Sequence, residues 1–563
     1  SSHIQSLDFD SNALKSVLIR SDKYGITLDK DITINKGLGN NVVIQANGTG
    51  TSIINNTGRT ITLGTGAKTS IGMLSSNNGY LENKGNIIVN EEKSQATAVL
   101  AGSSGKNSGT ITLSGKESLG VYNAATYTMS SGTITSGAEN SIGVYADNTL
   151  LTTISGGNIT AQNGGIALYS GDNSTINLSG SNLLTANQGG LLFYNYVNGS
   201  TVTGKYNITG PASANVNPGG MLLYAKVANL ADISTVAAAI KGAFANAGSL
   251  TVNMAAGSNV MYIDSPGGVV NILNFTGLPS LTSGFFNFTG SGYNDYVMNG
   301  FDLTLNDSTE SDLDSGSYGK IQFINTNVTV DSSTTVEGTN SAKQYIAIAQ
   351  RNNSSGTLAG RYIVNNGTIS LAGNGSTGIA GDYITVTNSS TGKIKLSGNN
   401  SIGMYVANGA DTLNQGLIEL GGQGSVGIYG GNYFDGSTSY TTLGYGNDQI
   451  DIENQKDIKT VAGGVSGDAF GIYADNNTTA VSSVNLTSTS NIDLKGTGTI
   501  IGAYLKKTNL INAGTITVES AAGGSSVGIY GDNSTATSIA GSVNVSGGSG
   551  TGIYLKNSTM SSG

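Results

Sequence analysis

Apolar and polar residues alternate in short runs along most of the chain, and the same runs return at nearly constant intervals. One run follows a glycine, as in GTITL at 109–113, GKIKL at 392–396 and GLIEL at 416–420. A period of two places the apolar side chains on one face of an extended strand. Each run therefore predicts a short β-strand with one buried face.

A second run ends in tyrosine and also recurs. Tyr122, Tyr145 and Tyr169 are 23 and 24 residues apart, and Tyr530 and Tyr554 are again 24 apart. Such a fixed period indicates a repeat architecture. The copies of this run are SIGVYADN (141–148), SIGMYVAN (401–408), SVGIYGGN (425–432), FGIYADNN (470–477), VGIYGDNS (527–534) and TGIYLKNS (551–558).

Each repeat of about 24 residues contains two or three strand-like runs, separated by Gly, Asn and Asp at turns. Some repeats add a third, weaker run, such as LLTTIS at 150–155. A unit this small cannot bury its apolar face alone, but stacked units can, with equivalent positions about 4.8 Å apart. We therefore expect an all-β fold, a right-handed parallel β-helix with one coil per repeat. Its recurring tyrosines would stack as a ladder near a corner.

The repeat divides the chain into four expected regions. Residues 1–40 differ from the repeat and are expected to form an N-terminal cap or irregular first coils. They include a possible helical turn at 12–20, followed by the strand-like GITL and ITI. Residues 41–224 and 302–563 are expected to be β-helix, and residues 225–301 an insertion on it.

The insertion combines a helix-like segment with aromatic residues. STVAAAIKGAFAN at 234–246 has the composition of a helix. Aromatic side chains on a loop are good contact groups for proteins or sugars. The alternative is that the helix and rings form a satellite core packed on the β-helix. The candidate receptor-binding residues of this region are Phe285, Phe286, Phe288, Tyr293 and Tyr296.

A second interruption lies at residues 430–449. Tyr429 and Tyr473 are 44 residues apart, so an insertion or a degenerate coil separates them. Tyr433, Phe434 and Tyr440 would be exposed on such a loop and are further receptor-binding candidates. A purely structural role for this segment is the alternative.

Composition limits the chemistry that the chain can carry. The net charge is −9, and only 11% of residues are charged, so nucleic-acid binding through a basic face is not expected. The chain has no cysteine and one histidine, His3, which argues against thiolate metal sites and cysteine nucleophiles. A DSGS string at 314–317 resembles the serine nucleophile segment of a protease, but no histidine base accompanies it. No apolar run is long enough to span a membrane.

Carboxylates at one register in adjacent coils would be the sign of an enzyme in this architecture. Asp147, Asp172, Asp475 and Asp532 share a register shortly after the repeated tyrosine. They lie in ADN and GDN strings, where Asp and Asn are ordinary turn residues. The acidic string DSTESDLD at 307–314 is more typical of a solvated loop than of a calcium site. We therefore expect no enzyme activity, no bound metal and no cofactor.

The paired S-x-G-I-Y and G-T-I-T-L phrases resemble the passenger domains of the large autotransporter adhesins of fusobacteria, which use type V secretion. The resemblance covers most of the chain and is best at 105–200 and 360–560. It implies surface display, a β-helical stalk and adhesion. The chain lacks the signal peptide and C-terminal membrane barrel of that family, and we expect it to be a fragment of a longer passenger.

The resulting hypothesis is a cell-surface adhesin rod that binds a protein or glycan receptor on host cells or partner bacteria. The resemblance implies anchoring in the bacterial outer membrane through a barrel that this chain does not contain. No nucleic acid and no direct membrane insertion are expected. Two alternatives stay open: a purely structural stalk segment, and a β-helix enzyme that cleaves polysaccharides.

Overall fold

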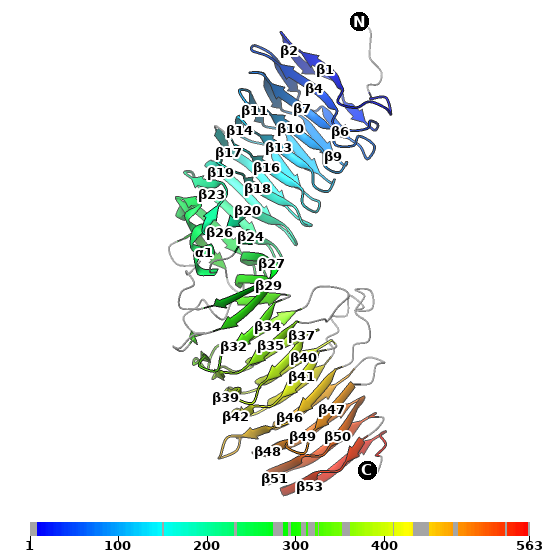
Figure 1. Cartoon of the computed structure of the whole chain (residues 1–563), viewed down its shortest axis with the longest axis vertical. Helices are drawn as coiled ribbons and strands as arrows, with labels where there is room; N and C mark the ends of the chain where they lie inside the picture. Colours follow the sequence, from blue (N-terminus) through cyan, green and yellow to red (C-terminus); the bar gives the residue numbers. More distant parts are fainter. Residues whose placement is uncertain are drawn as a thin grey trace. The chain divides into compact units, whose positions relative to one another are not determined.

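The computed structural model of the chain is a parallel β-solenoid (Figure 1). Its described strands pair in parallel, except in the hairpin between β20 (Leu191–Asn198) and β21 (Thr201–Val202). The predicted parallel β-helix is therefore confirmed. The residues that the structure describes are 8–148, 151–229, 233–273, 285–290, 294–305, 311–312, 321–324, 326–351, 361–408, 410–431, 450–476, 482–534 and 537–560.

The chain forms two compact units. The first unit comprises Ser1–Asp264 and Pro279–Val297, and the second comprises Ser265–Leu278 and Met298–Gly563. β27 (Asn259–Leu273) and β29 (Asn294–Leu305) contain residues of both. In each unit the strands stack in three columns, which we name the tyrosine, second and third columns in the order in which the chain visits them.

The first unit begins at the first coil. Its tyrosine column contains β1 (Val17–Ser21), β4 (Val42–Asn47), β7 (Ile71–Ser76), β10 (Gln95–Val99), β13 (Leu119–Asn123), β16 (Ile142–Ala146), β18 (Ile166–Ser170), β20 and β24 (Met221–Asn229). The second column contains β2 (Gly25–Leu28), β5 (Ser52–Asn55), β8 (Tyr80–Asn83), β11 (Ser104–Asn107), β14 (Thr126–Met129), β17 (Leu151–Ala161), β19 (Thr175–Ala186), β22 (Lys205–Ile208) and β25 (Phe244–Ala245). The third column receives the ends of β17 and β19 and contains β3 (Ile32–Ile34), β6 (Thr60–Leu63), β9 (Asn86–Val89), β12 (Thr110–Leu113), β15 (Thr133–Ser136), β23 (Ala212–Val216), β26 (Leu250–Met254) and β28 (Asn287–Gly290).

The second unit repeats this arrangement. Its tyrosine column contains β31 (Ile321–Ile324), β34 (Ile346–Arg351), β37 (Thr377–Asp382), β40 (Ile402–Ala407), β43 (Ser425–Gly431), β46 (Ala469–Asp475) and β49 (Thr499–Lys506). The second column contains the end of β29, β32 (Asn327–Val330), β35 (Tyr362–Asn365), β38 (Thr385–Asn388), β41 (Asp411–Asn414), β44 (Asp451–Asn454), β47 (Ser482–Leu486), β50 (Thr508–Asn512) and β52 (Thr537–Ile539). The third column contains β30 (Ser311–Asp312), β33 (Thr335–Gly338), β36 (Thr368–Leu371), β39 (Lys393–Leu396), β42 (Leu417–Leu420), β45 (Asp457–Thr460) and β48 (Asn491–Gly496), and β51 (Thr515–Asp532) and β53 (Ser542–Lys556) each run from it into the tyrosine column.

The alternating runs build the core as their pattern predicts. In the glycine-led run of β12, Ile111 and Leu113 are fully buried, while Thr110 and Thr112 are partly exposed. Ile111 lies directly over Ile134 of the next coil. Equivalent apolar side chains therefore stack along the interior, which gives each coil the buried contacts that it cannot make alone.

The repeated tyrosines form two stacked ladders, one in each unit. In the first unit Tyr145 and Tyr169 have ring centroids 4.8 Å apart and nearly parallel planes. In the second unit the Tyr473 and Tyr504 centroids are 4.4 Å apart. The predicted ladder is confirmed. It runs through Tyr122, Tyr145, Tyr169, Tyr194, Tyr224 and Tyr262 in the first unit and Tyr405, Tyr429, Tyr473, Tyr504, Tyr530 and Tyr554 in the second.

Buried polar side chains also stack from coil to coil. Asn388 accepts a hydrogen bond from the Asn365 amide at 2.9 Å and donates one to Asn414 at 2.8 Å. All three residues are fully buried. Each amide thus satisfies its neighbours inside the solenoid, where an unpaired polar group would be costly. A matching ladder joins Asn55, Asn83 and Asn107 in the first unit.

Two local predictions can be compared directly. The helical turn expected at 12–20 is wrong, because Val17–Ser21 is strand β1 and pairs with β4. Residues 17–34 are thus ordinary first coils, the second of the two alternatives for that region. The expected helix of the insertion is α1 (Ile233–Gly242), whose Val236, Ala237 and Ile240 are buried.

Candidate functional site

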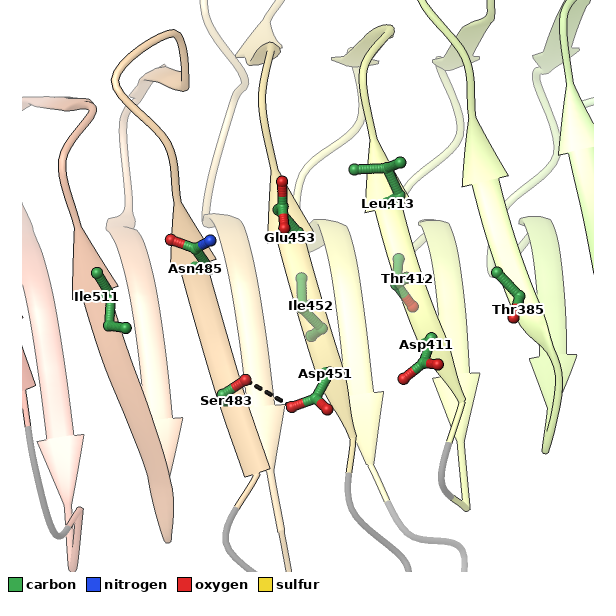
Figure 2. A pocket seen from close by; sticks show the side chains of 10 residues that line it. All are labelled: Thr385, Asp411, Thr412, Leu413, Asp451, Ile452, Glu453, Ser483, Asn485 and Ile511. Carbon is green, nitrogen blue, oxygen red and sulfur yellow. Dashed lines mark hydrogen bonds between the residues drawn. The ribbon is translucent and has the colours of Figure 1, made fainter. Parts of the chain in front are cut away.

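A groove crosses the outer face of the second column in the second unit (Figure 2). It has a volume of about 470 Å³ and extends over five successive strands, β38, β41, β44, β47 and β50. Because neighbouring parallel strands lie about 4.8 Å apart, the groove is elongated along the stack of coils. Its lining residues are Thr385, Asp411, Thr412, Leu413, Asp451, Ile452, Glu453, Ser483, Asn485 and Ile511.

Strand alternation decides which side chains face outward. Thr412 and Ile452 are buried and belong to the inner face, so they form the floor. The outward residues fall into two rows, since each strand contributes two of them. One row contains Thr385, Asp411, Asp451 and Ser483, and the other contains Leu413, Glu453, Asn485 and Ile511.

Two carboxylates occupy adjacent positions in the first row. Asp411 is the register partner of Asp451 on the next coil. Partial burial, and next the negative charge of Asp451, raise the pKa of Asp411 above its ordinary value. The Ser483 hydroxyl donates a hydrogen bond to Asp451 Oδ1 at 2.5 Å, drawn as a dashed line in Figure 2. The pair therefore consists of one hydrogen-bonded carboxylate and one carboxyl group whose charged form is disfavoured.

The second row gives the groove a mixed character. Glu453 accepts a hydrogen bond from the side-chain amide of Gln455, and Asn485 adds an amide beside it. Leu413 and Ile511 are apolar, and Ile511 is 54% exposed. Carboxylate, amide and hydroxyl groups beside apolar surface can bind a polar ligand through hydrogen bonds and hold it by contact with its apolar parts.

The sequence alone did not single out this pair of carboxylates. Asp411 and Asp451 are 40 residues apart, because the insertion at 430–449 lies between their coils, and a period of about 24 does not connect them. The available signal was local: DTLN at 411–414 and DIEN at 451–454 have the same pattern. Aligning these strings, rather than counting residues, would have placed the two aspartates side by side.

The aromatic candidates of the insertion are largely internal. Phe285 and Phe286 are 5% and 3% exposed, and their ring centroids are 4.1 Å apart. Phe244 packs edge-on against Phe286 at 5.3 Å, and Phe288 lies 5.9 Å from Phe286. Tyr296 is fully buried.

The expected exposure of Phe285, Phe286 and Tyr296 is therefore wrong, while Phe288 is partly exposed. Phe285 and Phe286 join Phe193 and Phe244 in a satellite core beside α1, the alternative that the sequence left open. The physical reason is that large rings contribute most when they pack together away from water. Tyr293, Tyr433, Phe434 and Tyr440 lie outside the described residues.

The four aspartates after the repeated tyrosines make structural contacts. Asp147 accepts a hydrogen bond from the Tyr122 hydroxyl at 3.0 Å. Asp475 pairs with Lys506 at 3.0 Å, and Asp532 pairs with Lys556 at 3.2 Å. The backbone oxygen of Asp172 accepts a hydrogen bond from the next corner. These contacts fix the corners of the coils.

The described residues contain no group of three or more His, Cys, Asp and Glu side chains arranged to hold a metal ion. Within the same ranges, α1 and the short 3-10 turn at Ala247–Ser249 are both too short to cross a membrane as a helix, and no helix there qualifies as a membrane span.

Comparison with protein-family models, with curated proteins and with solved structures finds no match to this chain.

Proposed function

We propose that this chain is a segment of a cell-surface adhesin, a β-solenoid that presents a non-covalent binding surface to another cell. The observation that carries the proposal is the elongated groove on the second unit, with its mixture of acidic, amide and apolar side chains. The resemblance of the repeated phrases to autotransporter adhesins supports the same reading.

The proposed partner is a receptor, protein or glycan, on host cells or partner bacteria. The chain would lie outside the cell, anchored in the bacterial outer membrane through a segment of a longer protein, and would need no cofactor. Tyr433, Phe434 and Tyr440 remain candidate contacts, because residues 432–449 lead directly into Asp451 of the groove. Burial of Phe285 and Phe286 moves our preferred contact surface from the insertion to the groove.

Saturable binding of the whole chain to intact cells tests this proposal. Replacing Asp411 and Asp451 with asparagine should weaken binding because it removes two charges from the groove. A matched control is replacement of Glu419 and Asp493 with Gln and Asn. These are also acidic and partly exposed in the same stack of coils, but they lie in the third column.

The adhesin proposal predicts that the groove variant binds more weakly than the control variant. Equal binding by the two variants would show that the groove is not the contact surface. No saturable binding to any cell type would favour the structural stalk.

The adjacent carboxylates favour one further candidate, cleavage of a polysaccharide. Glycosidases use two carboxyl groups, one of them with a raised pKa, and the pKa of Asp411 is raised. The measurement is the appearance of new reducing ends or unsaturated products when the chain meets polysaccharides. Activity that is lost in both Asp411→Asn and Asp451→Asn would establish this candidate, and no product from any polysaccharide would remove it.

A further inference from the structure

The last coil that the structure describes leaves an open strand edge. β53 pairs in parallel with β51, and no partner lies along its other edge among the residues that the structure describes. Val543, Val545 and Ile553 are partly exposed, although their register partners Ile516 and Val518 are fully buried. An open edge with half-exposed apolar side chains is a template for another strand.

A glycine on this edge points to a covering strand. In the second unit a Cβ on Gly427, Gly471 or Gly502 would come within 2.6 Å of a carbonyl oxygen of the following coil. Gly552 occupies the same position in β53, and a Cβ there would meet nothing within 4 Å. The repeat thus retains at Gly552 a residue whose small size is needed only under another coil.

Tyr554, the last rung of its ladder, has the same character. One face of its ring stacks on Tyr530 at 5.1 Å, and the residue is 48% exposed. Beside it runs a row of alternating charge that contains Asp475, Lys506, Asp532 and Lys556. A strand that continues both rows would place a flat or apolar group over Tyr554 and an acidic group beside Lys556.

Strand β1 of the first coil has this pattern. Register pairs connect Arg20 with Gln45, Leu74, Ala98 and Tyr122, so Arg20 occupies the tyrosine row. Two residues later Asp22 is exposed and paired with Arg20 at 2.8 Å. β1 pairs with β4 on one side, and Val17 is 38% exposed.

We propose that the chain self-associates head to tail, with β1 of a second copy docking in parallel on β53. The register places Ile19 on Ile553, Arg20 over the ring of Tyr554 and Asp22 beside Lys556. Guanidinium groups stack well on aromatic faces, and the new carboxylate continues the row of alternating charge. The two edges are different surfaces, so the contact does not close and it propagates into filaments. This proposal is independent of any receptor.

The mass of the whole chain in solution, measured over a wide range of concentration, tests the proposal. The unmodified chain should grow beyond a dimer as concentration rises. Ile553→Lys should stay monomeric, because it puts a charge into the apolar contact. Gly552→Val should also weaken association, although it meets no atom in the isolated chain. Circular dichroism checks that both variants keep the β-fold.

Cysteine pairing tests the register, because the chain contains no cysteine. Thr551 and Val17 would be register partners, with Cα atoms about 4.8 Å apart, within the range that a disulfide spans. A Thr551→Cys chain mixed with a Val17→Cys chain should therefore cross-link on oxidation. It should not cross-link with Leu100→Cys, whose residue is equally exposed elsewhere.

Three results would overturn the proposal. The first is a chain that stays monomeric at every concentration, and the second is Ile553→Lys associating as strongly as the unmodified chain. The third is Thr551→Cys cross-linking to itself or to Leu100→Cys as readily as to Val17→Cys.

Discussion

Replacement of Asn388 with alanine measures what the buried amide ladder contributes to stability. Asn388 is fully buried and lies between Asn365 and Asn414, with hydrogen bonds of 2.9 and 2.8 Å. The substitution removes both bonds and leaves a donor on Asn365 and the acceptor of Asn414 without their ladder partner. Each unpaired buried group costs about 1–3 kcal/mol, so we expect a loss of about 2–6 kcal/mol.

The loss should be local, because each coil of a solenoid contacts mainly its neighbours. Hydrogen exchange of the amides at 361–420, followed by mass spectrometry, measures the free energy of opening of these coils. Thr387→Ala is the matched control, since Thr387 neighbours Asn388 on the same strand but faces outward. If Asn388→Ala lowers the free energy of opening no more than Thr387→Ala does, the ladder does not stabilise the solenoid in the way described.

A companion variant separates hydrogen bonding from burial. Replacing Asn365, Asn388, Asn414 and Asn454 together with leucine removes donors and acceptors from both sides of each bond. Since no ladder amide is then left unpaired within this group, the cost per residue should be smaller than for Asn388→Ala. A larger cost per residue would contradict the argument and would point to the shape of the amides instead.

Three further predictions follow from the same structure. Asp451→Asn should lower the pKa of Asp411, followed by NMR titration, because it removes a negative neighbour that raises this pKa; an unchanged value would assign the shift to burial alone. With the folded pKa of Asp411 above 3.8, the folded state holds this proton more tightly, so the contribution of Asp411 to stability should fall as pH rises through that interval, and Asp411→Asn should flatten the pH dependence of urea unfolding there. Phe286→Ala should destabilise the first unit by about 3–5 kcal/mol and Phe288→Ala by less, because Phe286 is 3% exposed and Phe288 is partly exposed, and equal losses on thermal unfolding would contradict this assignment.

The strands and their register were the most predictable part of the molecule. GITL and ITI are β2 and β3 as expected, and the helix of the insertion lies within two residues of its expected start. These elements depend on short-range patterns, in which alternation or composition states which face is buried. The expected helical turn at 12–20 failed because VLIRS joins the tyrosine column, and pairing with β4 outweighs local preference.

The candidate site was much less predictable. Exposure of Phe285 and Phe286 depended on whether rings from distant positions would cover them, and Phe193 and Phe244 do so. The Asp411–Asp451 pair depended on which coils become neighbours across an insertion. Neither can be read from a local pattern, because both depend on contacts between residues that are far apart in the sequence.

By itself the sequence determined the coil. Its period, its alternation and its recurring Ile-Tyr phrase require parallel stacking, since no single repeat can bury its apolar face. Tertiary structure alone decided which outward side chains meet in the groove, which aromatic rings are covered, and which strand edges stay open. The physical reason is that the inner face repeats and is set by one rule, whereas the outer face is assembled from whichever residues the stacking brings together.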